Sequence, residues 1–275
     1  GVNHLGQPEL CLGLRGIAYI ELSVKTASID IPSGFGGSIA PNAAWRLIWA
    51  LNTLKDSQER IRIPGFYDAV CNPSAYDLEL LEMLPDESQE MILQYGLKHF
   101  LKKLSKGIEL KREKVFAPAC TICGLTSGYQ GSGSNTIMPA RASAKLDFRL
   151  VPDQDPQDIF TKLRKHLDLE GFTDIEITYL GGEKPGRTDP KHPFVTLTRE
   201  TGYEVYSQEM AVWPMMGESG PIDVFVKLLQ IPVVSAGIDY PGSCIHAPNE
   251  NIIMKNFMDG IRHTARIIEG SGNKP

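Results

Sequence analysis

Apolar and polar residues alternate most regularly over residues 141–150, "RASAKLDFRL". A period of two predicts a half-buried strand, because successive side chains of a strand point to opposite faces. The apolar face carries Ala142, Ala144, Leu146, Phe148 and Leu150. Less regular alternation with β-branched residues predicts three further strands, at residues 15–31, 118–129 and 173–182.

Two segments between these strands have helical spacing instead. Residues 43–56 place apolar positions three and four apart, with Asn42 as the expected N-cap, and residues 153–171 begin with an acidic first turn. The order is strand, helix, an insertion of about 60 residues, strand, strand, helix, strand, which matches a ferredoxin-like β-α-β-β-α-β module. We expect this module at residues 17–182, with the insertion at about 57–118 and a connection at 1–16.

Residues 86–107, within the insertion, are amphipathic with a basic end and predict one or two helices. Beyond residue 182 the pattern changes to alternating helices and strands. The spacing predicts helices at 194–207, 220–230 and 251–270, and strands at 209–215 and 231–239; the last is fully apolar, as in a parallel sheet. Two strands are too few for a stable doubly wound sheet. Residues 183–275 are therefore expected to be part of an α/β domain.

Composition narrows the function classes. The net charge of −5 favours neither nucleic acid nor an anionic membrane surface, and no apolar run approaches the ~20 residues of a membrane span. Five widely spaced cysteines argue against a disulfide framework and favour a reducing, cytoplasmic compartment. Cys120 and Cys123 form one C-x-x-C, but its strand-like context favours structural residues over a redox or zinc motif.

His246, in "CIHAPNENI", is a candidate metal ligand. It follows the predicted apolar strand on its C-terminal side, where open α/β sheets place ligands. A structural histidine is the alternative. Asn249 and Glu250 then have a simple role as the cap and first-turn carboxylate of the final helix.

Three further residues are candidates for substrate binding. Arg149 falls on the polar face of its strand, where it can bind a carboxylate through two parallel hydrogen bonds or remain a solvated arginine. Thr136 ends a polar Gly/Ser loop thirteen residues earlier. Ser219 lies between Gly217 and Gly220 before a predicted helix, so it borders free backbone N–H groups or only caps that helix.

Six stretches together resemble the cocatalytic zinc metallopeptidases that include carnosinase, cytosolic dipeptidases and aminoacylase (peptidase family M20). They are "GLRGIAYIELSV", "SGFGGSIAPN", "IPGFYD", "NTIMPARASAKLDFRLVPDQ", "GESGP" and "HAPNE", and they extend over nearly the whole chain. The resemblance implies an α/β zinc domain with an inserted ferredoxin-like lid that forms a homodimer. Residues 183–275 would be the C-terminal part of that catalytic domain. A preceding segment would carry the general base and most metal ligands.

The resemblance also implies roles for individual residues. His246 matches a zinc ligand, Arg149 the arginine that binds the substrate's terminal carboxylate, and Thr136 and Ser219 substrate-contacting residues. The implied reaction is hydrolysis of dipeptides or N-acyl amino acids by water activated between two zinc ions. Because one histidine cannot hold two zinc ions, we expect this chain alone to be inactive. An edge strand or helix near residues 30–55 is expected to form the dimer.

Pro32 departs from the family pattern. The family has Asp-x-His-Ser-Gly where this chain reads "DIPSG", and that histidine polarises the scissile carbonyl in the partner's site. Proline can neither ligate a metal nor donate a hydrogen bond, and loss of one such donor costs roughly a hundred- to a thousand-fold in rate. The alternative is therefore a relative that has lost catalysis and serves in dimerisation or ligand binding.

Overall fold

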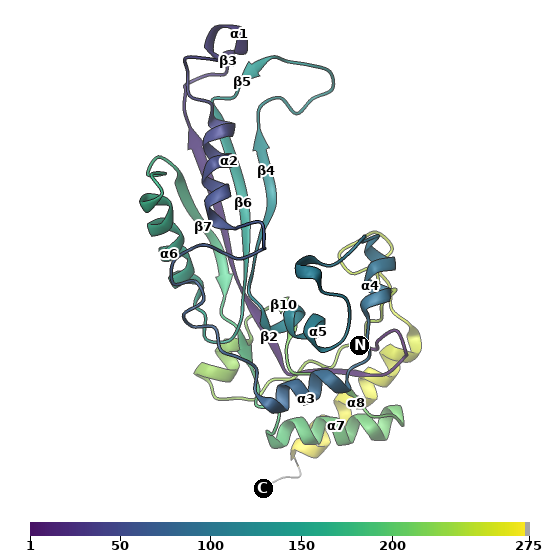
Figure 1. The fold of residues 1–275 in the computed structure, drawn as a ribbon. Helices are drawn as coiled ribbons and strands as arrows, with labels where there is room; N and C mark the ends of the chain where they lie inside the picture. Colours follow the sequence, from purple (N-terminus) through teal and green to yellow (C-terminus); the bar gives the residue numbers. More distant parts are fainter. Residues whose placement is uncertain (273–275) are drawn as a thin grey trace. The chain divides into compact units, whose positions relative to one another are not determined.

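The computed structural model describes residues 1–272, which divide into two compact units (Figure 1). Unit 1 comprises residues 1–15, 72–117 and 185–272, and unit 2 comprises residues 16–71 and 118–184. Most of the predicted insertion therefore groups with the N-terminal and C-terminal residues. None of the helices in the described part of the chain combines the length and hydrophobicity needed to cross a bilayer.

Unit 2 is built on an antiparallel sheet in the order β7-β2-β6-β4. Its strands are β2 (Gly13–Lys25, of which the residues from Gly16 onward belong to unit 2), β4 (Ala119–Ser127), β6 (Arg141–Leu150) and β7 (Glu176–Glu183). The β2–β6 register extends without interruption from Gly16 opposite Leu150 to Lys25 opposite Arg141. All four predicted strands are present, although the first ends at Lys25 and not at residue 31, and their spatial order is consistent with a ferredoxin-like module.

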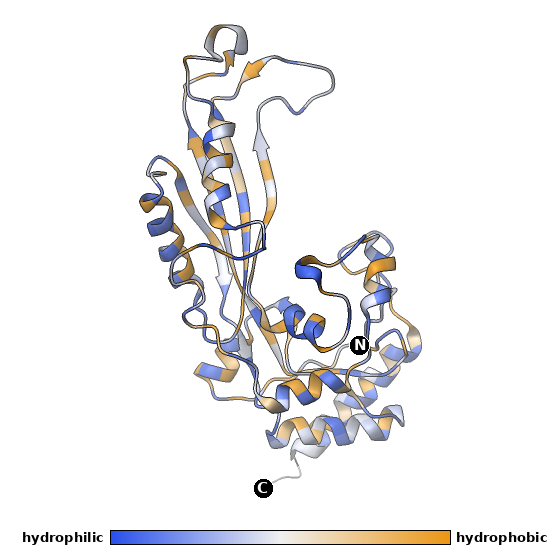
Figure 2. Cartoon of the chain, in the orientation of Figure 1, coloured by the Kyte–Doolittle hydropathy of each residue, from blue (hydrophilic) through white to orange (hydrophobic). Residues whose placement is uncertain are grey.

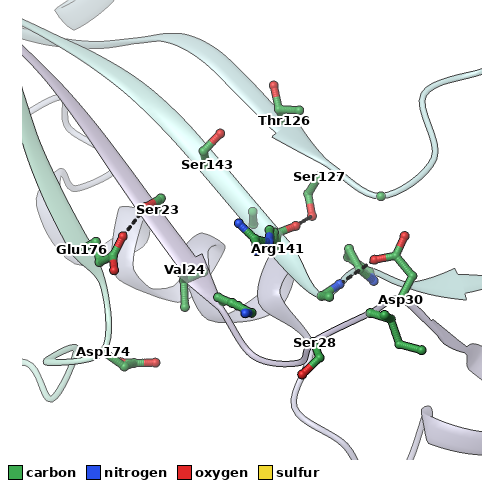
Figure 3. A pocket seen from close by; sticks show the side chains of 16 residues that line it. Ser23, Val24, Ser28, Asp30, Thr126, Ser127, Arg141, Ser143, Asp174 and Glu176 are labelled. Carbon is green, nitrogen blue, oxygen red and sulfur yellow. Dashed lines mark hydrogen bonds between the residues drawn. The ribbon is translucent and has the colours of Figure 1, made fainter.

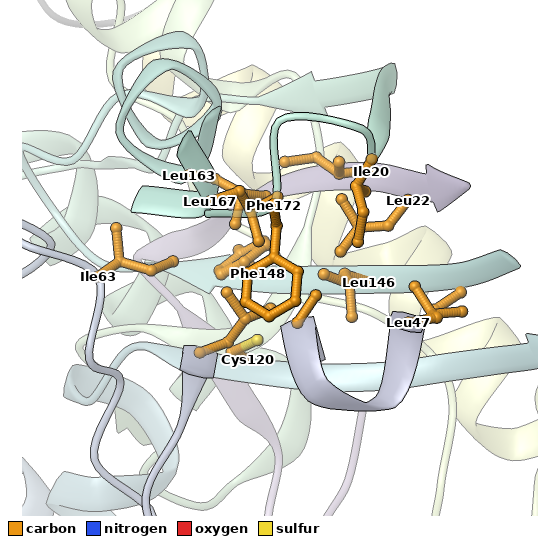
Figure 4. Packing of buried hydrophobic residues seen from close by; sticks show 14 of the residues in the cluster. Ile20, Leu22, Leu47, Ile63, Cys120, Leu146, Phe148, Leu163, Leu167 and Phe172 are labelled. Carbon is orange, nitrogen blue, oxygen red and sulfur yellow. The ribbon is translucent and has the colours of Figure 1, made fainter. Parts of the chain in front are cut away.

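Two helices, α2 (Ala43–Leu54) and α6 (Pro156–Leu169), contribute their apolar faces to the same core as the sheet. The Asn42 side chain accepts a hydrogen bond from the backbone N–H of Trp45, which confirms the predicted cap. Asp155 caps α6, with Pro156 at its first position. Because β6 alternates strictly, its inward side chains, such as Leu146 and Phe148, pack among these helices (Figure 4). Figure 2 shows the same alternation along the strands.

Unit 1 contains short strands and five α-helices among its described residues. The strands are β1 (Glu9–Cys11), β8 (Gly186–Arg187), β9 (Ala211–Trp213) and β10 (Met216–Ser219). The α-helices are α3 (Ala75–Met83), α4 (Ser88–Tyr95), α5 (Ile108–Phe116), α7 (Pro193–Tyr206) and α8 (Met254–Gly272). β1 pairs in parallel with β9, while β10 and β8 flank the first residues of β2. The helix predicted at 194–207 and the strand predicted at 209–215 are confirmed as α7 and β9.

Two predictions in unit 1 were wrong or too long, and the prediction of one or two helices at 86–107 is confirmed with a short α-helix and a turn. Residues 231–239 form no strand, and only an isolated bridge joins Ser235 to Cys11. The segment is apolar because Val234 and Ala236 pack against a core cluster, and this packing does not require a strand. The helix predicted at 220–230 is reduced to a π-helical turn, η2 (Val224–Leu228). The amphipathic 86–107 segment contains α4 and a 3-10 turn, η1 (Leu101–Lys103), separated by the left-handed Gly96.

Candidate functional site

Arg149 and Asp147 form an ion pair on the polar face of β6. Nε and Nη2 of Arg149 lie 3.1 and 3.0 Å from Oδ2 of Asp147. The arginine side chain is 32% exposed and the aspartate 14%. The alternating pattern predicted correctly that Arg149 lies on this face. By the same two-residue period, Asp147 lies on the same face as the neighbour of Arg149. The carboxylate holds the guanidinium in one orientation while part of it stays accessible to solvent.

Thr136 and Pro32 lie on adjacent segments. A two-residue ladder joins β3 (Ile31–Pro32) to β5 (Ile137–Met138), and the backbone N–H of Ser33 donates to the carbonyl of Thr136 at 2.9 Å. The short helix α1 (Ser33–Gly36) follows directly. Thr136 and Pro32 are both exposed. Thr136 and Pro32 therefore lie on one surface. Their proximity could not be predicted from the sequence, because about a hundred residues separate them.

Thr136 and Arg149 are not brought together within this chain. β6 begins at Arg141, close in sequence to Thr136, and Arg149 is near its other end. Eight residues of strand separate Arg141 from Arg149 by roughly 27 Å, at about 3.4 Å per residue. Figure 1 shows β3, β5 and α1 beyond one end of the sheet. One substrate molecule of dipeptide size cannot contact both side chains in the same copy.

Ser219 ends β10, which pairs in parallel with the start of β2, so that Ser219 lies opposite Arg15. It is half-buried, whereas Glu218 beside it is exposed. Arg15 is buried, and its guanidinium donates to the carbonyls of Lys114 and Ala117. Ser219 therefore belongs to a short, well-anchored strand and does not cap the π-helical turn that follows.

A buried ion pair lies beside the same small sheet. Arg187 of β8 donates to both oxygens of Asp77, at 3.2 Å for Nη1 to Oδ2. Burial alone would raise the pKa of Asp77, but hydrogen bonds from Arg187 and Ser74 outweigh it and lower that pKa. Ser74 and Asp77 also form a capping box at the start of α3. The pair stabilises unit 1 and was missed at the sequence level, since 110 residues separate its members.

His246 is exposed and lies in a loop with unusual backbone geometry. Cys244, His246 and Asn249 all have positive φ, at 52°, 59° and 65°. Left-handed backbone at non-glycine residues is strained and concentrates at functional sites. Asn249 is therefore part of this loop and not the expected helix cap, because α8 begins only at Met254.

Three side chains hold the His246 loop in this conformation. The Tyr240 hydroxyl donates to Oδ1 of Asn251 at 2.7 Å, and Nδ2 of Asn251 donates to the carbonyls of Gly242 and Asn249. The Ser243 hydroxyl accepts from the backbone N–H of Tyr240 at 2.9 Å. His246 is thus held on a turn that is braced by the side chains of Tyr240, Ser243 and Asn251.

The described residues do not by themselves form a zinc site. Within residues 1–272, no three His, Cys, Asp or Glu side chains gather in an arrangement that could hold a metal ion. Zinc sites in proteins use three or four such ligands. Cys120 and Cys123 are free and lie on β4, with Cys120 buried and Cys123 exposed. Burial raises the pKa of Cys120 to about 12, so this thiol is inert as a nucleophile or ligand.

Comparison with known proteins places these features in context. A family model described as "Peptidase dimerisation domain" matches residues 12–174. The Cys-Gly metallodipeptidase DUG1 of Candida albicans is 24% identical over 93% of this chain and 53% of its own length. The Beta-Ala-His dipeptidase of Homo sapiens is 23% identical over 93% of this chain and 51% of its own. The chain spans about half the length of these curated relatives.

Solved structures of peptidases also match this chain. The M20 family metallo-carboxypeptidase Sso-CP2 from Sulfolobus solfataricus aligns with a TM-score of 0.93 and 35% identity, over 98% of this chain and 61% of that one. The dipeptidase Dug1p from Saccharomyces cerevisiae aligns with a TM-score of 0.85 and 22% identity, over 98% and 57% of the two chains. The second match is a similarity of fold. The first extends to sequence across nearly all of both units.

Proposed function

Because the chain belongs to the M20 peptidase family, with a dimerisation domain at residues 12–174, we propose that it forms part of a zinc-dependent peptidase that hydrolyses dipeptides or N-acyl amino acids. The observation that carries the proposal is the 35% identity to a metallo-carboxypeptidase over 98% of this chain. Relatives named as metallodipeptidases and dipeptidases support the substrate class. Five free cysteines support a reducing, cytoplasmic location.

Arg149 is the proposed anchor for the substrate's terminal carboxylate. A guanidinium that is already oriented by Asp147 loses little conformational freedom when it binds a second carboxylate. The expected partner is the α-carboxylate that dipeptides and N-acyl amino acids share. Since Thr136 precedes Arg141, which is itself roughly 27 Å from Arg149 at about 3.4 Å per residue, the proposed substrate contact of Thr136 is in the partner's site of a dimer.

His246 is the proposed zinc ligand of this chain. Its exposure and the strained, braced loop around it support that role. Since the described residues gather no further ligands around it, we also propose that this chain alone is inactive. The remaining ligands and the general base would come from polypeptide other than residues 1–272.

Two measurements test this function. Protein from its natural source should hydrolyse dipeptides, lose activity with a chelator and regain it with zinc; absence of turnover there would contradict the proposal. The isolated 275-residue chain should bind zinc weakly or not at all, and His246→Ala should abolish what binding there is. Tight binding of two metal ions, or robust turnover by this chain, would contradict its proposed inactivity.

Pro32 supports a second candidate function, that of a dimerising or ligand-binding relative without catalysis. The residue is exposed, and its segment pairs with the one that carries Thr136. If a missing hydrogen-bond donor limits the rate, Pro32→His in the natural enzyme should raise kcat roughly a hundredfold. No gain would mean that Pro32 is not the cause of any low activity.

A homodimer through unit 2 is the proposed assembly. Trp45, Ile48 and Trp49 leave an exposed apolar stripe on α2, at the three- and four-residue spacing of one helix face. The edge strand β4 exposes Ile122 and Leu125. The double substitution Trp45→Lys/Trp49→Lys should shift the chain to a monomer in light scattering. Leu169→Lys, at an exposed position of α6, is the matched control and should leave the assembly unchanged.

A further inference from the structure

A cavity of about 660 Å³ opens on unit 2, away from Arg149. It lies over the polar face of the sheet where β2 ends and β6 begins, with β4 and β7 contributing on either side. Figure 3 shows Arg141 near its centre, with Ser23 and Glu176 on one side and Asp30 on the other. Its volume is within the range of small-molecule sites. The proposed peptidase function uses none of these side chains.

The cross-strand rows beneath this cavity have an unusual charge pattern. Lys25 lies directly opposite Arg141 in the β2–β6 register. Like charges directly opposite each other destabilise a sheet. Two rows further along the same face, outside the cavity, Glu21 lies opposite Lys145 and the charges are complementary. Of these two charged rows, the row with like charges, Lys25 and Arg141, is the one that lines the cavity.

The row between them carries hydroxyl groups. Ser23 on β2 and Thr126 on β4 both lie opposite Ser143 on β6, and all three line the cavity. Hydroxyls can donate to an anion or accept from a cation. Lys25 and Arg141 form no ion pair within residues 1–272, so their charges face the cavity uncompensated by direct contact.

Carboxylates border the two cations. Asp174 is bound by Arg46, with Nε to Oδ2 at 2.9 Å, and Asp30 accepts from the backbone N–H of Ala140 at 2.8 Å. Glu176 accepts only a 3.4 Å hydrogen bond from Ser23 and makes no ion pair in the described part of the chain. The cavity is thus dipolar. A simple anion would meet repulsion from Glu176 and Asp30, whereas a ligand with both charges would match both groups.

We propose that this cavity binds a small zwitterionic peptide. The peptide carboxylate lies between Lys25 and Arg141, and its ammonium group reaches Glu176. Arg141 and Glu176 lie two strands apart and, because Glu176 is in register with Ser23 and Arg141 with Lys25, two residues apart along the strands, which gives roughly 12 Å at about 4.8 Å per strand and about 3.4 Å per residue. An extended dipeptide spans about 7 Å, and the two long side chains cover the remainder. This site is distinct from the substrate site proposed at Arg149.

The experiment is a titration of the chain with alanyl-alanine, followed by amide chemical shifts, with a chelator present so that no hydrolysis depletes the probe. Saturable shifts should map to residues 23–30 and 139–143. Arg141→Gln and Glu176→Gln should each weaken binding at least about tenfold, the effect of losing one charge-assisted hydrogen bond. Lys145→Gln, on the same face outside the cavity, is the matched control and should leave binding unchanged.

Two analogues separate the charges. N-acetyl-alanine lacks the ammonium group and alaninamide lacks the carboxylate, so both should bind at least about tenfold more weakly than the dipeptide. The proposal is overturned by absence of saturable binding, by acetate binding as tightly as the dipeptide, or by loss of binding in Arg149→Gln and not in Arg141→Gln. The last result would place the peptide in the proposed substrate site. Retained spectral dispersion in each variant shows that it is folded.

Discussion

Units 1 and 2 differ in how they bury their apolar residues. In unit 2 one continuous cluster lies between the sheet and the helices α2 and α6. In unit 1 the buried residues divide into two smaller clusters, and α8 exposes Phe257, Met258 and Ile261. The buried side of α8 instead carries Asp259, Gly260 and His263.

The difference shows what amphipathic patterning requires. α2 and α6 each bury one apolar face because the strands that match it are in the same unit, and α2 in addition exposes the apolar stripe described above. The apolar side of α8 has no such surface among the described residues of unit 1, so its polar side packs on α7, with Nε2 of His263 2.9 Å from the carbonyl oxygen of Thr198. An exposed apolar helix face of this kind is typical of a surface that other polypeptide covers.

The largest expected effect is in the core of unit 2. Phe148→Ala should lower the free energy of unfolding by about 3–5 kcal/mol, since Phe148 is fully buried and its loss leaves a cavity. Hydrogen exchange read by mass spectrometry should show faster exchange across β2, β4 and β6. The matched control, Phe257→Ala on exposed α8, should change little. Equal losses in the two variants would contradict the contrast between the units.

The next effect concerns ion pairs. Arg187→Gln in unit 1 should cost about 3 kcal/mol, at the lower end for breaking a buried pair because Arg187 is 21% exposed whereas Asp77 is 4% exposed. Arg46→Gln, which breaks the more exposed Arg46–Asp174 pair of unit 2, should cost no more than about 1 kcal/mol. Chemical denaturation of both variants measures the difference. A larger loss for Arg46→Gln would show that exposure does not control these energies.

A smaller effect depends on pH and is shared by both units. Burial lowers the pKa of His166 in unit 2 and of His263 in unit 1. The unfolded chain takes up protons first as the pH falls below the ordinary histidine pKa of about 6.5. Stability is therefore full above that pH and declines as the pH falls toward the lowered folded pKa values.

Three variants test this pH dependence. Thermal unfolding between pH 7.5 and 5 should show a weaker decline in His166→Gln and in His263→Gln than in the parent chain. His99→Gln, at an exposed position, serves as the control and should behave like the parent. Stability that rises on acidification over this range would refute the assignment.

The smallest effect on stability is expected on α8. Phe257→Gln with Ile261→Gln should change the free energy of unfolding by no more than about 0.5 kcal/mol per site, as for surface positions. The same double variant should reduce nonspecific association of the chain in light scattering, because it interrupts the exposed apolar face. A loss of several kcal/mol would mean that this face is buried in solution.

Sequence patterns predicted unit 2 better than unit 1, for a physical reason. Strands of 8 to 13 residues with a buried face give a long alternating signal, whereas β1, β8, β9 and β10 have only two to four residues each. An apolar run such as 231–239 does not distinguish a strand from an extended segment packed on a core. The helices α3 and α5 gave no amphipathic signal strong enough to recognise within the insertion.

For the candidate site, too, some features could be predicted from the sequence and others could not. Alternation along β6 alone determined that Arg149 points away from the core, and the same two-residue period determines that Asp147 lies beside it. The direction of these two side chains is a local property, because it depends on residues within a few positions of one another. The M20 family was predicted from six such motifs taken together in their order along the chain.

Only the tertiary structure decided which distant residues meet. It brought Pro32 beside the Thr136 segment, separated Thr136 from Arg149 along β6, and placed Lys25 opposite Arg141 in one cavity. Strand register and pairing decide these contacts, and both depend on interactions between segments more than a hundred residues apart in sequence, as between Lys25 and Arg141. The sequence by itself determined which face each side chain occupies; the packing of the segments determined what that side chain faces.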